Sequence, residues 1–166
     1  MNKALFLDRD GVLNRKAQPR EYIKNPEELI WNNWAQELII CAKDLGYIIC
    51  VITNQQWIGK WLYTLDNVLT IHEYMQSDLD RIGTRIDGFY VCPHLADDAC
   101  SCRKPEPWLL LQAIQDFDID ISQSFFIGDS ETDMQAGKKV GMETIKIESD
   151  NLGQFILYIE SLLLRS

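Results

Sequence analysis

Short apolar runs alternate along the chain with longer segments in which apolar side chains recur every three or four residues. Short apolar runs are typical of buried strands, and the three-to-four spacing is typical of amphipathic helices. Their alternation favours a central parallel sheet with helices on both faces. The pattern therefore predicts an α/β fold, a Rossmann-like three-layer sandwich. The expected strands are residues 4–7, 47–52, 89–92, 124–127 and 144–147.

Five helices are expected between and after these strands. Gly46 follows the first helix at the position where a left-handed residue ends many helices, and the hydroxyl of Thr64 suits the start of the second. Pro107 is expected to begin the third helix. The five segments are residues 34–45, 64–82, a stretch from Pro107 onward, 131–140 and 152–163.

The length of 166 residues fits one domain, so we expect residues 1–166 to share a single core. No interval between the predicted elements is long enough for a lid, and no large cap domain is expected. The irregular stretch 14–34 is polar, contains Pro19 and Pro26, and directly follows the first strand. Because ligands bind at the carboxyl ends of strands in α/β sheets, this stretch is a candidate wall of the functional site.

The composition is that of a globular protein, with 46% hydrophobic and 25% charged residues. The formal net charge of −9 argues against nucleic acids and anionic membranes as partners, because these favour surfaces rich in Lys and Arg. A small phosphorylated substrate needs only a few local cations. No segment approaches the ~20 apolar residues of a membrane span, and residues 1–10 lack a signal-peptide core. We expect a cytoplasmic monomer.

Polar residues suited to phosphate chemistry stand where the predicted strands end. Asp8 and Asp10 follow the first strand, and a second acidic motif, 129–133, follows the fourth. Taken singly, each is an ordinary turn motif. Their repetition favours function, because several carboxylates at one sheet edge repel one another unless a divalent cation lies among them. The other candidates are Thr53, Asn54 and Gln55 after the second strand, the cations Arg103 and Lys104, and Ser130 and Asp133 beside Asp129.

From Asp8 to Asp133 these residues match in order the four motifs of the haloacid dehalogenase superfamily of phosphatases, which the chain resembles over nearly its whole length. The resemblance implies that Asp8 is a nucleophile that forms an aspartyl-phosphate, so that hydrolysis takes two displacements. Asp10 would protonate the leaving alcohol and later activate water. That role requires a raised pKa, which neighbouring carboxylates can supply. Thr53 and Lys104 would stabilise the phosphoryl group during transfer.

The same resemblance implies a Mg²⁺ ion and a set of substrate contacts. The ion would be held by Asp8, by the backbone carbonyl of Asp10 and by Asp129, with waters and a substrate oxygen completing its octahedron. Asp133 would orient these ligands without binding the ion. Substrate contacts are expected from Asn54, Gln55, Arg103 and Ser130.

Three cysteines and one histidine crowd the segment 92–102, namely Cys92, His94, Cys100 and Cys102. Three sulfurs and one imidazole suit tetrahedral Zn²⁺, and four protein ligands make a closed, structural site. The alternatives are ordinary buried cysteines or a redox pair at Cys100 and Cys102. We expect zinc, which would fix the loop that presents Arg103 to the substrate.

A zinc loop followed by Cys-Arg-Lys-Pro also resembles a narrower group, the capless heptose 1,7-bisphosphate and histidinol-phosphate phosphatases. Segment 22–28 is more similar to the heptose enzymes, whereas residues 56–61 depart from their usual Ser-Gly-Ile-Ala-Arg-Gly. The expected substrate is a sugar bisphosphate, whose second anionic portion would meet Arg103 and Lys60. Histidinol phosphate is the alternative, with its amine against acidic residues of the zinc loop.

Two rival functions remain at this point. A polynucleotide 3′-phosphatase shares the four motifs, but the acidic charge and the zinc loop count against it. A zinc-stapled binding module without catalysis would have no need of so many adjacent carboxylates. Trp57 and Trp61 flank the phosphate-binding segment and are candidates to stack on a substrate. His72 is expected to be a surface or boundary residue of the second helix, away from every motif.

Overall fold

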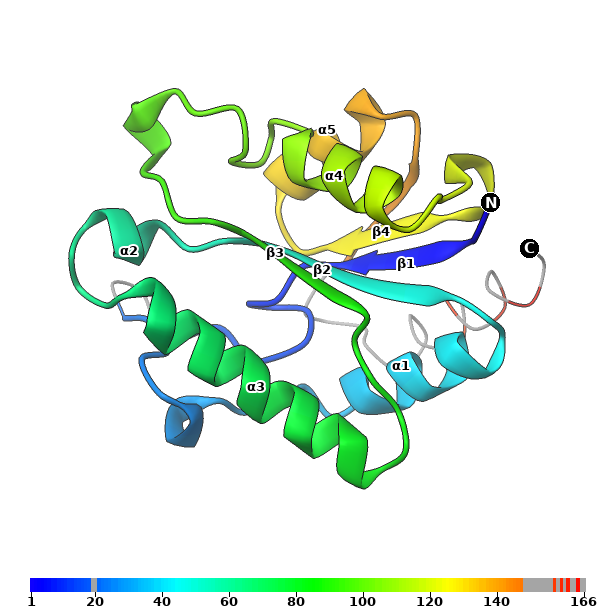
Figure 1. Ribbon diagram of the computed structural model, residues 1–166, viewed down its shortest axis with the longest axis horizontal. Coiled ribbons are helices and arrows are strands. Elements are labelled where there is room, and N and C mark those ends of the chain that lie inside the picture. The colour runs from blue at the N-terminus through cyan, green and yellow to red at the C-terminus, as the bar shows by residue number, and fades with distance from the viewer. Residues whose placement is uncertain (19–20, 148–156, 158, 160, 162–163, 165–166) are drawn as a thin grey trace.

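Figure 1 shows the protein as a computed structural model that describes residues 1–18 and 21–147, together with residues 157, 159, 161 and 164. The helix expected at 152–163 lies largely outside the described residues. The other expected helices and strands fall within them.

The centre of the protein is a five-stranded parallel sheet in the order β3-β2-β1-β4-β5. Each strand lies within two residues of its predicted position, so the predicted sheet is confirmed. β2 runs further than expected and takes in Thr53 and Asn54. The strands are β1 Ala4–Leu7, β2 Ile48–Asn54, β3 Gly88–Cys92, β4 Phe125–Gly128 and β5 Glu143–Lys146.

Helices cover both faces of this sheet, with α1 and α3 on one face and α4 and α5 on the other (Figure 1). The α-helices of the described residues are α1 Ala35–Asp44, α2 Gln56–Gly59, α3 Leu65–Arg81, α4 Trp108–Asp116 and α5 Glu131–Lys139. Short 3₁₀ turns are found at η1 Pro26–Glu28, η2 Ala96–Asp98 and η3 Ile121–Gln123. The single turn α2 was not predicted, because four residues are too few to show a helical period.

Local sequence explains where the long helices begin and end. The hydroxyl of Thr64 accepts a hydrogen bond from the backbone N–H of Asn67, and the Asn67 side chain accepts one from the backbone N–H of Thr64. This capping box satisfies two N–H groups at the start of α3. Gly46 follows α1 with a φ of +84°, a left-handed conformation that glycine adopts without strain. Both predicted signals are confirmed, as is Pro107 immediately before α4.

Alternate residues of the strands pack into two apolar layers. Leu5 and Leu7 of β1 belong to the layer shared with α1 and α3, and Phe6 belongs to the layer shared with α4 and α5. All four residues of β1 are fully buried. Parallel strands that are buried on both faces have continuous apolar sequences, and this is why the strands can be recognised in the sequence. The predicted three-layer α/β fold is confirmed.

The carboxyl ends of β1, β2 and β4 meet at one edge of the sheet, because β1 pairs with β2 on one side and with β4 on the other. The order of the strands reverses at β1, and ligands of open α/β sheets bind at such a reversal. No separate cap domain covers this edge within the described ranges, since the segment between β1 and α1 forms only the short turn η1. No helix in the described part of the chain is long and apolar enough to cross a membrane.

Candidate active site

A buried ion pair lies at the carboxyl end of β1. Asp8 follows this strand, and its Oδ1 lies 2.7 Å from the Nζ of Lys104. The same ammonium group lies 2.7 Å from Oδ1 of Asp133 and donates a hydrogen bond of 2.7 Å to the carbonyl oxygen of Ile52. Lys104 and Asp8 are 3% and 8% exposed, so water screens their charges little. Two carboxylates share one cation here.

The pKa of Asp8 is raised to about 7, chiefly by burial and also by the negative charges of Asp133 and Asp10, while Lys104 opposes the rise. The opposing charges keep the pKa of Lys104 above its ordinary value, so this side chain stays protonated. The carboxyl group of Asp8 is thus divided between its protonated and ionised forms near neutral pH. An additional cation beside it would favour the carboxylate form, which is the form that can act as a nucleophile.

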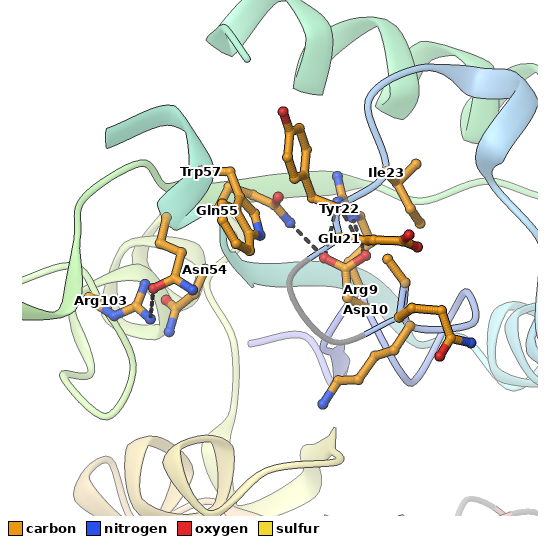
Figure 2. Close-up of a pocket in the computed structure, with 13 residues that line it drawn as sticks. Arg9, Asp10, Glu21, Tyr22, Ile23, Asn54, Gln55, Trp57 and Arg103 are labelled. Carbon is orange, nitrogen blue, oxygen red and sulfur yellow. Dashed lines mark hydrogen bonds and ion pairs between the residues drawn. The ribbon is translucent and has the colours of Figure 1, made fainter. Parts of the chain in front are cut away.

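The carboxylate of Asp10 is held by three side chains, two of which, Arg9 and Gln55, are drawn in Figure 2. Arg9 contacts both of its oxygens, at 3.2 and 3.0 Å from Nη2. The amides of Asn14 and Gln55 donate to it at 3.0 and 2.8 Å. Although burial acts to raise the pKa of Asp10, the charge of Arg9 and these hydrogen bonds lower it overall. The expectation of a raised pKa at Asp10 is wrong for this structure, and Asp8 carries the rise instead.

The end of β2 supplies amide and hydroxyl groups. Gln55 donates through Nε2 to Thr53 Oγ1 at 2.8 Å as well as to Asp10, and its carbonyl oxygen accepts from the hydroxyl of Tyr63. Asn54 accepts from the backbone N–H of Lys104 and donates to its carbonyl, both at 3.1 Å. This reciprocal pair fixes Lys104 to β2 across the edge of the sheet.

The turn from β4 into α5 carries the remaining acidic residues. Ser130 caps α5, and its hydroxyl lies 2.6 Å from Oδ2 of Asp133. The hydroxyl of Ser130 is therefore engaged in the cap and does not line the pocket described below. A Cβ on Gly128 would lie 2.2 Å from the Cβ of Asp133, so only glycine lets Asp133 approach β4 this closely.

The carboxylates of Asp8, Asp129 and Asp133 offer oxygen atoms that all lie within 4.8 Å of one another. Oδ1 of Asp129 is buried and has no hydrogen-bond partner among the described residues, and Oδ2 lies 2.5 Å from the Nζ of Lys16. A buried carboxylate oxygen without a donor leaves room for a further partner, such as a water or a cation. Hard oxygen ligands gathered in this way fit Mg²⁺.

The four expected zinc ligands lie together in the loop after β3. Sγ of Cys102 is 3.1 Å from Sγ of Cys92 and from Nδ1 of His94, and both cysteines lie 3.7 Å from Sγ of Cys100. Donor atoms bound to one tetrahedral Zn²⁺ at ~2.3 Å lie about 3.8 Å apart. The two distances to Cys100 match this value and the two 3.1 Å distances are shorter, and the donor set of three sulfurs and one imidazole suits zinc. All five cysteines are free of disulfide bonds.

Arg103 connects this loop to a pocket of about 280 Å³ beside Asp10. Its Nη1 donates to the carbonyl oxygen of His94 at 3.3 Å, and Nη2 donates to Oε1 of Gln56 at 3.4 Å. Figure 2 shows Arg103 at one end of the pocket and Arg9, Asp10 and Tyr22 at the other. The lining residues are Arg9, Asp10, Lys16, Ala17, Gln18, Glu21, Tyr22, Ile23, Asn54, Gln55, Gln56, Trp57 and Arg103.

Two expectations about side chains at the rim, those for Lys60 and Trp61, are corrected. Lys60 does not accompany Arg103 in the pocket; it is exposed and places Nζ 4.3 Å from the ring centroid of Trp57. Trp57 lines the pocket and stacks on Tyr22 at 5.0 Å, whereas Trp61 is 93% exposed and takes no part in the lining.

His72 is neither a surface residue nor remote from the motifs. It is 4% exposed, and its Nε2 lies 3.4 Å from Nη1 of Arg9. Sequence reasoning missed Arg9, His72 and Lys16 as members of this site. The position of Arg9 between two catalytic candidates was the available signal, whereas nothing in the pattern linked α3 to the end of β1.

Comparisons with known proteins agree with this geometry. A HAD-hydrolase-like family model matches residues 101–154. The D-glycero-beta-D-manno-heptose-1,7-bisphosphate 7-phosphatase of Helicobacter pylori is 43% identical over 137 residues, which make up 82% of this chain and 78% of that protein. The D-glycero-alpha-D-manno-heptose-1,7-bisphosphate 7-phosphatase of Burkholderia mallei is 37% identical over 156 residues, or 90% and 81% of the two chains.

Among solved structures, the D,D-heptose 1,7-bisphosphate phosphatase from B. bronchiseptica, complexed with magnesium and phosphate, superposes with a TM-score of 0.83. It is 29% identical, and the match covers 95% of this chain and 86% of that one. The extent of these matches decides the family. This chain belongs to the D-glycero-D-manno-heptose-1,7-bisphosphate 7-phosphatases, a family of HAD-like hydrolases.

Proposed function

We propose that this phosphatase hydrolyses the phosphate monoester of a sugar bisphosphate, with D-glycero-D-manno-heptose 1,7-bisphosphate as the substrate and Asp8 as the nucleophile. The observation that carries the proposal is the position of Asp8 at the end of the central strand, 2.7 Å from the buried ammonium of Lys104. A nucleophilic carboxylate, a fixed cation and a neighbouring second carboxylate are the groups that phosphoryl transfer requires.

The reaction takes two displacements. In the first, an oxygen of Asp8 forms a bond to phosphorus, the bond from phosphorus to the sugar oxygen breaks, and Asp10 gives its proton to that oxygen. In the second, a water oxygen attacks the phosphorus and releases Asp8, while Asp10 takes the proton from the water. Lys104 and Thr53 stabilise the negative charge of the transferring group in both steps.

The lowered pKa of Asp10 suits its part in the second displacement, because a base must be ionised to accept a proton. For the first displacement Asp10 must be protonated. The negative charge of the entering phosphate raises the pKa of a nearby carboxyl group. Binding of the substrate therefore favours the protonated form at the step that needs it.

Two metal ions are part of the proposal. Asp8, the backbone carbonyl of Asp10 and Asp129 would hold Mg²⁺, whose charge offsets that of the phosphate when it is bound. Asp133 would orient the site through its ion pair with Lys104. Burial raises the pKa of the Cys92 thiol, so that a cation is needed to keep this side chain as a thiolate. Zn²⁺ on the four-ligand cluster meets that need.

The pocket beside Asp10 supports a sugar bisphosphate more than histidinol phosphate. Its lining includes Lys16 and Arg103, two cations that suit a second phosphate. Asp97 and Asp98, which were expected to meet the amine of histidinol phosphate, do not line this pocket. Asn54, Gln55 and Arg103 remain the proposed substrate contacts. Ser130 is also a proposed contact for the phosphoryl group, which its hydroxyl would reach by turning away from Asp133.

Location, assembly and domain structure complete the proposal. Five cysteines without disulfide bonds support a reducing compartment such as the cytoplasm. The acidic net charge of −9 continues to disfavour nucleic acid and anionic membranes as partners. A monomer built as one domain over residues 1–166 stays a prediction.

A side-by-side assay tests this function. We expect Mg²⁺-dependent phosphate release from the heptose 1,7-bisphosphate with a higher kcat/KM than from histidinol phosphate or a 3′-phosphorylated oligonucleotide. The Asp8→Asn variant should lose at least about a thousandfold in kcat while keeping its unfolding temperature. Substantial activity in Asp8→Asn would remove the nucleophile assignment, and a preference for histidinol phosphate would move the substrate to the alternative.

A further inference from the structure

We propose that Arg9 and His72 are positioning residues for Asp10: the buried guanidinium group of Arg9 fixes the carboxylate, and the imidazole of His72 fixes the guanidinium group. The inference rests on the proposed function, since it assumes that Asp10 moves the protons of both displacements. Neither residue would touch the substrate's reacting atoms.

Arg9 is an arginine held inside the protein, with an exposed fraction of 1%. Its Nε lies 3.3 Å from Oδ1 of Asp10, and its Nη2 lies 3.2 Å from Oδ1 and 3.0 Å from Oδ2. A guanidinium fork that meets both oxygens of a carboxylate fixes its plane as well as its position. Asn14 and Gln55 add one hydrogen bond each, but Arg9 alone among these partners carries a charge.

The remaining end of the guanidinium group meets His72, which reaches it from α3. Nη1 of Arg9 lies 3.4 Å from Nε2 of His72. Arginine has only donors, so the imidazole accepts through Nε2 and carries its proton on Nδ1. The ring of His72 is itself held by stacking on Phe89 of β3, with centroids 4.2 Å apart and planes within 14°. His72 of α3 and Phe89 of β3 therefore help to hold Arg9 in place, and Arg9 in turn holds Asp10.

His72 is suited to this part because it stays neutral. Burial, and then the positive charge of Arg9, lower its pKa to about 3. A protonated imidazole would have no acceptor for Arg9 and would repel it. The neutral ring accepts a hydrogen bond from Nη1 of Arg9. Without His72, this buried N–H group would lose that acceptor.

A small displacement of Asp10 affects only the steps in which a proton moves. Departure of a sugar alkoxide requires a proton, whereas departure of 4-nitrophenolate hardly does, because it is already a stable anion. kcat/KM reports the steps up to the transfer of the phosphoryl group to Asp8. A positioning role thus predicts a loss in kcat/KM for the sugar bisphosphate and little loss for 4-nitrophenyl phosphate.

The decisive variant is His72→Phe, which keeps the stacking on Phe89 and removes the acceptor. We expect its kcat/KM for the sugar bisphosphate to fall about tenfold, part of the 100- to 10,000-fold that a general acid contributes, and its kcat/KM for 4-nitrophenyl phosphate to stay within about threefold. His72→Gln, whose amide oxygen can accept from Nη1, should restore most of the loss. Arg9→Lys, which keeps the charge but lacks the fork, should show the same selectivity as His72→Phe.

The controls separate this inference from the function on which it rests. Asp10→Asn should show the same selectivity in a stronger form, and Tyr74→Phe, at an exposed position of α3, should leave both substrates unaffected. Equal losses for both substrates, or none, in the soluble His72→Phe and Arg9→Lys variants would overturn the positioning role. If Asp10→Asn itself lacked the selectivity, the proposed role of Asp10 would be wrong instead.

Discussion

The ammonium group of Lys16 lies 2.5 Å from Oδ2 of Asp129, a residue of the proposed magnesium site whose Oδ1 is buried without a hydrogen-bond partner among the described residues. Lys16 is 57% exposed and comes from the loop after β1, so it can leave this position at small cost. Its single positive charge therefore lies beside the site proposed to bind the doubly charged Mg²⁺ ion.

Removing this charge should strengthen metal binding. Lys16→Met is expected to lower the Mg²⁺ concentration for half-maximal activity about three- to tenfold, since a unit charge a few ångströms from the ion repels it by about 1 kcal/mol even in a water-like medium. A Mg²⁺ titration at saturating substrate measures this, so that a weaker hold of Lys16→Met on the second phosphate does not alter the result. Lys24→Met removes a charge elsewhere in the same loop and should leave the titration unchanged. If the native protein reached half-maximal activity at a lower Mg²⁺ concentration than Lys16→Met, the expected repulsion would be contradicted.

Lys104 should be essential for stability as well as for activity. Lys104→Met leaves Asp8 and Asp133 buried without their shared cation, and breaking a buried ion pair costs about 3–5 kcal/mol. Urea unfolding measures this cost. The matched control is Lys139→Met, which breaks the exposed pair with Glu106 and should cost about 0–1 kcal/mol. Equal costs for the two variants would show that Lys104 is not paired as described.

Asp87 should make folding sensitive to acid. Its carboxylate accepts from Lys43, Arg85 and the backbone N–H of Ile49. Burial opposes these interactions, but together they lower the pKa of Asp87. Because the folded pKa lies below the unfolded one, the stabilisation is full above about pH 4 and is lost as pH falls through the folded pKa.

The comparison of the native protein with Asp87→Asn tests this sign. The native protein should be more stable by about 1–3 kcal/mol at pH 7, with the same difference at pH 5 and a smaller one at pH 3.5. Urea unfolding at each pH gives the values. Asp80→Asn, at an exposed carboxylate, is the control and should show little difference at any pH. A gap between native protein and Asp87→Asn that widens toward acid would refute the lowered pKa.

The cysteine cluster should hold one zinc ion per chain. Metal analysis of protein purified without chelator should find it, and Cys100→Ser should lose it, since structural zinc is bound with roughly 10–16 kcal/mol in small peptides. The loop that carries Arg103 would then loosen, so we expect KM to rise more than kcat falls. Cys41→Ser, outside the cluster, is the control. Full-length protein that contains no zinc would leave the cluster as four ordinary side chains.

Much of the fold was predictable because the strands are buried on both faces. β1 is an unbroken apolar run whose predicted bounds, 4–7, are those observed, and Thr64 and Gly46 mark helix ends by their own chemistry. The sequence also indicates which polar residues stand at strand ends. Parallel strands bring those ends together, and Asp8 and Asp129 accordingly lie close together in the structure, whereas their roles stay predictions.

The contacts that tune the site were not predictable in the same way. His72 meets Arg9 across 63 positions of sequence, and this contact depends on how α3 packs on β3. The direction of the pKa shift at Asp10 also failed to follow from its acidic neighbours, because the nearest charge in space belongs to Arg9. A pattern of apolar and polar residues indicates which side chains are buried. The contact between His72 and Arg9 and the pKa shift of Asp10 depend instead on which polar groups lie next to each other in the folded protein.

The long separation between Asp8 and Lys104, 96 positions, has a consequence for how the enzyme forms. Contacts between residues far apart in sequence form slowly, because the chain must close large loops before they are made. A folding intermediate that had built only the N-terminal strands would contain Asp8 without the ammonium group that accompanies it. Enzyme activity regained after dilution from urea should therefore return later than helical circular dichroism. The delay would measure how long the contact between Asp8 and Lys104 takes to form.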